Sequence, residues 1–545
     1  MNMQYGQSQL RRALLPVFFA TMLTACGGSD KDDEQPPTPP ATEQPAPEPT
    51  PAPVETGAWS KGDLHIHTFQ SDDAQVSLQS VLDQAFDRYQ LDWAAISNHL
   101  RSDRRDHTGA DIVPAPIPFS QGMATYEVPF IKEQQALGRY KDKIIFSSFE
   151  WDMPTHDHVN IGIGVNDPMS DASLTAVAEF EYLFTNRPAS MFDPALVTRL
   201  SSTPRAYTTH ADAMTALTWL RDNHPDSYML LNHPLRYVDR YSAANVREMH
   251  DIAPDQFFAI EGMVGNQMEP DRGGYVAPAR TYGGTDVMVA QLGGIWDSLL
   301  GEGRRIWTVA DSDFHFRTNN GNSSGYAPGE YAKTYVHKDG DDMASVVAGL
   351  KSGRVFSVFG DLIDALEFSA QSVAGTAQMG GEVQATAGEE VEVTIRFRSP
   401  ERNNYEYPIE SGNPTFVKPT VDHVDLIVGD VGERAATGTP EYASAANAST
   451  RVLARFDRDD WTVDEDGYNV ITYRMTASGN QYLRLRGTNL GVNVANEMAN
   501  GEPLADATIS GSTISNNAAR FDAINARNYN DLWFYSNPVF VTVAE

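Results

Sequence analysis

Short apolar runs alternate with amphipathic stretches over the first part of the chain. The runs are bounded by polar residues and have the length of strands that are buried on both faces. We predict strands at residues 93–97, 144–146, 229–231 and 306–310. Apolar side chains recur at helical spacing in the stretches between them, which predicts helices at residues 78–88, 211–221 and 287–300. Strand–helix alternation of this kind favours an α/β fold with a parallel sheet or barrel.

The pattern changes after Gly360. Residues 391–398 alternate apolar and polar side chains with a period of two, as in a strand with one buried face. Similar segments, separated by turns rich in Gly and Asn, follow at residues 424–428, 468–474 and 482–486. We therefore expect an α/β domain at residues 58–360 and an antiparallel β-sandwich at residues 361–545.

The chain begins with the pattern of an export signal. Arg11 and Arg12 precede an apolar stretch at residues 13–23, which is too short to span a bilayer as a helix. It ends in Leu-Thr-Ala-Cys-Gly, which resembles the bacterial lipobox and places a lipid on Cys26. The alternative is a cleaved signal that happens to contain a cysteine. We predict a lipoprotein signal peptide at residues 1–25.

Residues 26–57 have the composition of a tether, with nine prolines between Pro36 and Pro53 and several acids. Proline fixes φ and removes a backbone donor, so such a segment is extended and solvated. By resemblance to bacterial lipoproteins, Gly27 and Gly28 after the cysteine favour the outer membrane. The predicted location is the periplasmic side or the cell surface, with the membrane contacted through the lipid anchor.

The composition limits which partners and which metal ligands the chain can have. The 545 residues include 41 Lys and Arg against 73 Asp and Glu, a formal net charge of −32, which argues against nucleic acid as a partner. A single cysteine excludes an internal disulfide framework and a thiolate metal cluster. Histidine and carboxylates remain as metal ligands, and twelve of the 13 histidines lie between His65 and His337.

Chemistry-bearing residues follow the predicted strands. His99, Glu150, His233 and Asp313 each come at or just after the carboxyl end of one of them. In parallel α/β folds that edge carries the active site. An ordered series of histidines and acids runs through the same region, in the pattern His-x-His, Asp, His, Glu, His, His-Pro and Ser-Asp-x-His. Its members are His65, His67, Asp72, His99, Glu150, His158, His233, Asp313 and His315.

This series resembles the polymerase-and-histidinol-phosphatase (PHP) superfamily of metal-dependent hydrolases. The resemblance covers about residues 57–360, and segments 352–355 and 533–539 resemble the extracytoplasmic CehA/McbA-like branch, which carries an added β domain. It implies a distorted (β/α)7-type barrel with the site at the carboxyl ends of its strands. It also implies two or three divalent ions, of zinc, manganese or iron.

The resemblance assigns the ligands to three ions. One ion takes His65, His67, Glu150 and Asp313; a second takes Glu150, His158 and His233, with Glu150 bridging; a third takes Asp72, His99 and His315. Two alternatives stay open from the residues themselves, namely His156 in place of His158 and Asp73 in place of Asp72. The family commonly has an acid where this chain has Asn98, a position we expect outside the ligand set.

Three arginines lie close in sequence to predicted ligands. Arg101 follows His99, Arg236 follows His233, and Arg317 follows His315. In an otherwise acidic protein they predict a small anionic ester as the substrate.

The function predicted from these features is phosphoester hydrolysis, with a hydroxide formed from water on the bridged metals as nucleophile. The proton donor is not assigned, although His107 and His156 are candidates. Hydrolysis of a carboxylic or carbamate ester on the same site is the second hypothesis. The third is a non-enzymatic surface lipoprotein whose β domain binds a glycan or partner.

Overall fold

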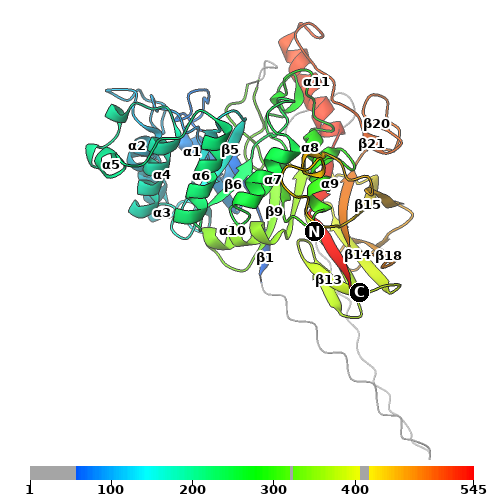
Figure 1. The fold of residues 1–545 in the computed structure, drawn as a ribbon. Helices are drawn as coiled ribbons and strands as arrows, with labels where there is room; N and C mark the ends of the chain where they lie inside the picture. Colours follow the sequence, from blue (N-terminus) through cyan, green and yellow to red (C-terminus); the bar gives the residue numbers. More distant parts are fainter. Residues whose placement is uncertain (1–56, 319–322, 406–416, 545) are drawn as a thin grey trace, which may run out of the picture. The chain divides into compact units, whose positions relative to one another are not determined.

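The fold is described for residues 57–318, 323–405 and 417–544 in a computed structural model of the chain (Figure 1). The predicted signal peptide, Cys26 and all of the predicted tether except Gly57 lie outside these residues. Within the described part, no helix has both the length and the apolar character needed to cross a membrane.

Eleven strands form the largest sheet. In spatial order its main path is β13 (Glu382–Thr386), β23 (Val539–Ala544), β19 (Gln481–Thr488), β22 (Trp533–Ser536), β10 (Val355–Phe359), β9 (Ala332–Lys338), β1 (Ala58–Ile66), β2 (Trp93–Ile96) and β3 (Ile144–Ser147). β15 (His423–Asp430) pairs with β19, and β16 (Arg451–Asp457) pairs with β15. The strands β1, β2 and β3 run parallel, as the predicted strand–helix alternation requires.

A second sheet of five strands carries the rest of the predicted α/β region. Its order is β4 (Phe149–Asp152), β5 (His158–Gly162), β6 (Tyr228–Leu231), β7 (Phe257–Met263) and β8 (Trp307–Ala310). β6, β7 and β8 are parallel, whereas β4, β5 and β6 are antiparallel neighbours. β7 is buried along its whole length, which is typical of a strand covered on both faces.

The two sheets are joined where their strands end. Ile66, the last residue of β1, bridges to Phe314 beyond β8, and His99 beyond β2 bridges to Glu150 in β4. Both bridges are parallel. Strand ends from both sheets therefore converge on one place, as expected for the carboxyl edge of a parallel α/β fold.

Along the chain, most helices lie in the segments that connect these strands. The α-helices are α1 (Leu78–Leu82), α2 (Phe119–Gly122), α3 (Val128–Ala136), α4 (Asp171–Phe184), α5 (Pro194–Arg199), α6 (His210–Asn223), α7 (Ala243–Ile252), α8 (Val287–Ala290), α9 (Ile295–Leu300), α10 (Met343–Ser352) and α11 (Asn517–Asn530). The π-helices are η1 (Asp83–Arg88) and η2 (Met123–Glu127), and the 3-10 helices are η3 (Ala189–Met191), η4 (Arg272–Gly274) and η5 (Glu441–Ala443). α6 packs against both α4 and α7 (Figure 1).

The helix predicted at residues 211–221 is confirmed as α6, which begins with a capping box between Thr209 and Asp212. The prediction of one helix over residues 287–300 is wrong, because α8 ends at Ala290 and α9 begins at Ile295. Gly293 between them has φ +72°, a conformation that interrupts a right-handed helix.

The C-terminal part is richer in strands. A third sheet has the order β12 (Gly375–Gln378), β11 (Ala365–Ser372), β14 (Glu390–Arg398), β18 (Asn469–Thr476) and β17 (Thr462–Val463), and β20 (Met498–Ala499) pairs with β21 (Glu502–Pro503). Strands after residue 360 also belong to the 11-stranded sheet, where β22 pairs with β10. The mixed α/β class is thus confirmed, whereas the specific barrel and the separate sandwich are not.

Candidate metal centre

Glu150 lies at the centre of a buried cluster of histidines. Its carboxylate oxygens are within 3.5 Å of ring nitrogens from five of them: His65 (3.2 Å), His67 (3.3 Å), His99 (2.9 Å), His158 (2.8 Å) and His233 (3.5 Å). The rings come from β1, the segment after β1, the segment after β2, β5 and the segment after β6. Segments far apart in sequence thus deliver their side chains to one carboxylate.

Asp313 faces the same cluster from the segment after β8. One of its oxygens is 3.1 Å from His65 Nε2 and 3.2 Å from His67 Nε2. The ligand atoms of these three residues and of Glu150 all lie within 4.8 Å of one another. The structure therefore brings together the four residues that the resemblance assigns to the first ion.

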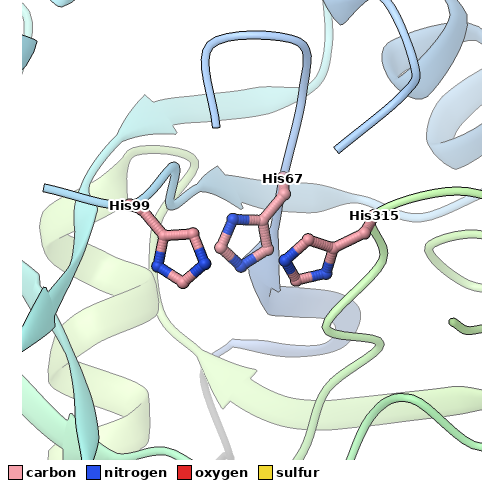
Figure 2. Close-up of side chains that lie close together, drawn as sticks. All are labelled: His67, His99 and His315. Atoms are coloured by element: carbon pink, nitrogen blue, oxygen red, sulfur yellow. The ribbon is translucent and has the colours of Figure 1, made fainter. Parts of the chain in front are cut away.

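Two of the other groups that meet the same spacing contain His99 together with at least one more histidine. One comprises His99, Glu150 and His158, and the other comprises His67, His99 and His315. Figure 2 shows the His67 ring between the rings of His99 and His315. The His67 and His315 rings are stacked, with centroids 3.9 Å apart. These groups have residues in common, so the cluster offers neighbouring metal sites that share ligands.

Several atoms of this cluster are buried without hydrogen bonds in the described structure. They include His67 Nε2, His99 Nδ1, Glu150 Oε2, His158 Nδ1, both ring nitrogens of His233, and Asp313 Oδ1. Buried polar atoms without partners are costly, and so many at one place are explained if a cation binds there. Imidazole nitrogens and carboxylate oxygens suit divalent zinc, manganese or iron. The residues fit a metal site of this kind.

Outer partners orient several of the rings. His65 Nδ1 lies 3.1 Å from Glu261 in β7, His67 Nδ1 lies 2.8 Å from Ser71 Oγ, and His158 Nε2 lies 3.0 Å from Asp152. Metal-binding histidines usually donate their second N–H to such an acceptor, which fixes the tautomer and aims the other nitrogen at the ion.

Glu261 and Asp152 are not among the residues that the sequence predicts for the site. A signal for Glu261 is present, because it is a single carboxylate inside the otherwise apolar run 257–263. For Asp152, on the solvent side of β4, the sequence carries no comparable signal.

Electrostatics of the cluster follow from burial and from close opposite charges. Burial by itself raises the pKa of Glu150, but His158, His65 and His99 hold that pKa well below its usual value. Burial lowers the pKa of His158, whereas Glu150 and Asp152 raise it to about 10. The cluster therefore keeps Glu150 ionised, as a bridging ligand must be.

Two further buried acids support the backbone beneath the ligands. Asp63 accepts hydrogen bonds from the backbone N–H groups of His65 (3.0 Å) and Ser312 (3.2 Å), and Asp311 accepts one from Leu64 (2.7 Å). These bonds tie the end of β1 to the segment after β8. Burial raises the pKa of Asp63 to about 7.

The structure distinguishes the neighbouring acids Asp72 and Asp73. Asp73 lies 3.2 Å from His99 Nε2 and 3.4 Å from His315 Nε2. Asp72, the acid preferred from the sequence, pairs with Arg101 Nη1 at 3.0 Å and is about half exposed. Both acids lie close to His99, but Asp73 is the one that faces both histidines of the third predicted ligand set.

His158 rather than His156 faces the cluster. His156 Nε2 lies 2.8 Å from His210 Nδ1, and its Nδ1 lies 2.6 Å from the backbone oxygen of Arg240. Both of its ring nitrogens thus contact partners away from Glu150.

Asn98, where the family commonly has an acid, lies behind the ligands. Its side chain donates to Glu127 (2.9 Å) and accepts from the backbone N–H of Thr68 (2.7 Å) and from Ser71 Oγ (3.0 Å). Because Ser71 contacts His67, Asn98 acts on the cluster through that hydroxyl group.

The three predicted substrate-binding arginines differ in placement. Each is paired with an acid, namely Arg101 with Asp72 and Asp152, Arg236 with Asp157, and Arg317 with Glu330. Only Arg236 of the three lines the cavity at the metal centre, whereas Arg317 lines a separate cavity beside Phe521.

The cavity at the cluster has a volume of about 350 Å³. It is lined by Asp73, His99, Glu150, His158, Arg236, Asn266, Glu269, Gly274, Asp313, His315, Phe316 and Ser324. A space of this size and polarity fits a small polar substrate.

Comparisons with known proteins add little to this picture. No known family profile matches the chain, and no curated protein matches it. One solved structure that is similar is a two-domain protein from Bacteroides vulgatus, described as containing a predicted PHP-like metal-dependent phosphoesterase. The match covers 83% of this chain and 94% of that one, at 11% identity and a TM-score of 0.32. Similarity at this level does not establish a shared fold.

Proposed function

We propose that this protein is a metal-dependent hydrolase that cleaves a small phosphate ester. The observation that carries the proposal is the convergence of buried ring nitrogens and carboxylate oxygens around Glu150 at the wall of a cavity, several of them without a hydrogen bond. Divalent ions bound there would lower the pKa of a water molecule and supply positive charge at the ester. No serine or cysteine nucleophile is then required.

The roles of the chain's own residues follow from their positions. One ion would be held by His65, His67, Glu150 and Asp313. A neighbouring ion would be held by His99 and His158 together with the same Glu150. Arg236 presents its guanidinium to the cavity while Asp157 fixes it through Nε (3.2 Å) and Nη2 (2.8 Å). A guanidinium held in this way can orient an anionic oxygen of the substrate.

Hydrolysis of a neutral carboxylic or carbamate ester is the second candidate. It is favoured by the pairing of Arg236 with Asp157, which offsets the arginine's charge, and by the absence of Arg101 and Arg317 from the described lining of the cavity. The same metal-activated water would attack a carbonyl carbon.

The test is a comparison of substrates with one chromophore. Metal-loaded protein should release p-nitrophenol from p-nitrophenyl phosphate or bis(p-nitrophenyl) phosphate, and both a chelator and Glu150→Gln should abolish the release. Turnover of p-nitrophenyl acetate alone would support the second candidate. A fully metal-loaded protein that hydrolyses none of the three would refute both and favour a binding lipoprotein.

We also propose the fold, the family branch and the location that the sequence suggests. The fold is a PHP-type distorted barrel at residues 58–360 followed by a β-sandwich at 361–545, and the branch is the CehA/McbA-like one. The protein would be exported as a lipoprotein anchored at Cys26, on the periplasmic side or the cell surface. These assignments are supported by the sequence motifs and by the acidic composition, which also disfavours nucleic acid as a partner.

A further inference from the structure

Glu269 is a carboxylate in the wall of the metal cavity that the histidine cluster does not engage. The other acids in that wall, Asp73, Glu150 and Asp313, each lie within 3.5 Å of at least one histidine nitrogen. The half-buried Glu269 side chain makes no hydrogen bond or ion pair with any described residue. Its carboxyl group is therefore available to a molecule in the cavity.

The backbone holds Glu269 firmly in the loop between β7 and η4. Its N–H donates to the backbone oxygen of Asn266 (3.2 Å), and its own backbone oxygen accepts from Arg527 Nη2 in α11 (3.2 Å). Asn266 in turn donates from its side chain to Asp313. The loop is thus fixed on one side to a predicted metal ligand and on the other to the C-terminal helix.

The surroundings of Glu269 favour a protonated carboxyl group near neutral pH. Burial raises its pKa to about 7, with Asp271 and Asp313 adding to the increase and His315 opposing it. A general acid is most effective when its pKa lies near the working pH. The candidates suggested by sequence, His107 and His156, do not contribute to the described lining of the cavity.

We propose that Glu269 is the proton donor to the leaving group; the inference rests on the phosphoesterase function proposed above. The oxygen of the attacking water forms a bond to phosphorus, and its proton passes to solvent. The bond from phosphorus to the leaving oxygen breaks, the electron pair stays on that oxygen, and the Glu269 carboxyl group gives it a proton. The carboxylate then recovers a proton from solvent.

The experiment compares two monoesters that differ in how much they need a proton donor. Phenol has a pKa of about 10, as tyrosine does, whereas p-nitrophenol is far more acidic and leaves without protonation. Glu269→Gln should lower kcat for phenyl phosphate by about 100-fold but leave kcat for p-nitrophenyl phosphate within a few-fold. Bound metal and unfolding temperature should equal those of the wild type.

Glu248→Gln provides the control, because Glu248 is an exposed acid of α7 that does not contribute to the described lining of the cavity. It should leave both rates near the wild-type values. Glu269→Asp, which keeps the acid on a shorter side chain, should restore part of the phenyl phosphate rate, and it serves as the test if the Gln variant does not fold.

Each other outcome overturns the inference. Equal losses on both esters would show that Glu269 does not protonate the leaving group, and loss of bound metal in Glu269→Gln would make it a ligand instead. Wild-type protein that hydrolyses neither monoester would refute a phosphomonoesterase and with it the role of Glu269, and failure on bis(p-nitrophenyl) phosphate as well would refute the proposed phosphoesterase function itself. Wild-type turnover of both esters with no selective loss in the variant would refute only the role of Glu269.

Discussion

The Glu261 carboxylate lies 3.1 Å from His65 Nδ1, while Nε2 of the same ring lies 3.2 Å from Glu150. The ring is therefore held between an outer acid and the central acid of the cluster. Glu261 also accepts hydrogen bonds from the backbone N–H groups of His233 (3.2 Å) and Gly265 (2.8 Å). One side chain thus fixes both a ring and the backbone of a second predicted ligand.

Glu261→Gln should weaken metal binding by 10- to 100-fold. The neutral amide is a poorer acceptor for His65 Nδ1–H, and its NH2 group cannot accept from a backbone donor. Competition with a chromogenic chelator measures the affinity. Glu248→Gln, at an exposed acid of α7, should bind metal as the wild type does, and an equal loss in both variants would contradict a specific role for Glu261.

The adjacent acids Asp72 and Asp73 allow a matched pair of variants. Asp73→Asn should lower the amount or affinity of bound metal, because Asp73 faces both His99 and His315. Asp72→Asn should have little effect, since it removes a half-exposed contact with Arg101. Metal analysis after dialysis distinguishes the two. A greater loss of bound metal in Asp72→Asn than in Asp73→Asn would show that Asp72 is the ligand.

Arg236→Ala should raise the KM for a phosphate monoester by 10-fold or more, because Arg236 is the predicted arginine that lines the cavity. Arg317→Ala, which changes another cavity, should not. The KM for p-nitrophenyl acetate should remain unchanged in both variants. A larger effect of Arg317→Ala on the phosphate ester would mean that the anion binds elsewhere.

Removal of metal should lower the apparent unfolding temperature. Ions that bind only the folded state stabilise it, by about 2.7 kcal/mol when the free ion is at 100 times its Kd. Thermal unfolding followed by circular dichroism, before and after chelation and after readdition of zinc or manganese, measures the effect. An unchanged unfolding temperature in protein shown to have lost its metal would contradict the prediction.

Glu127, the partner of Asn98, gives a prediction for pH. Burial raises its pKa from 4.5 to about 7, while Ser147 and Asn98 lower it. The folded state thus binds the proton more tightly than the unfolded state. Relative to Glu127→Gln, wild-type stability should fall as pH rises from about 4.5 to 7, by at most about 1.4 kcal/mol per pH unit.

Urea unfolding of both proteins at pH 5 and pH 8 measures this difference. Glu133→Gln, at an exposed acid on α3, should follow the wild type at both values. A constant difference between wild type and Glu127→Gln would show that the carboxyl group titrates normally.

The sequence by itself determined the positions of several strands and which residue types are available to bind a metal. Strands β2, β3, β6 and β8 lie where apolar runs predict them, because a strand buried on both faces is apolar at most positions. The mixed α/β class followed from their alternation with helices. His99 and His233, just after β2 and β6, were visible because the carboxyl ends of parallel strands carry the site in such folds. Glu150 was expected at the end of the strand at 144–146 but lies within a separate strand, β4, which is antiparallel to β5.

Only the tertiary structure decided which side chains face one another. The choice between Asp72 and Asp73 depends on the direction of two adjacent side chains in a loop, which residue types do not encode. Glu261 and Glu269 acquire their roles from the folding of β7 and the loop after it against β1 and β8. The pairing of β10 with β22 joins segments about 180 residues apart, and such contacts arise only when the whole chain packs.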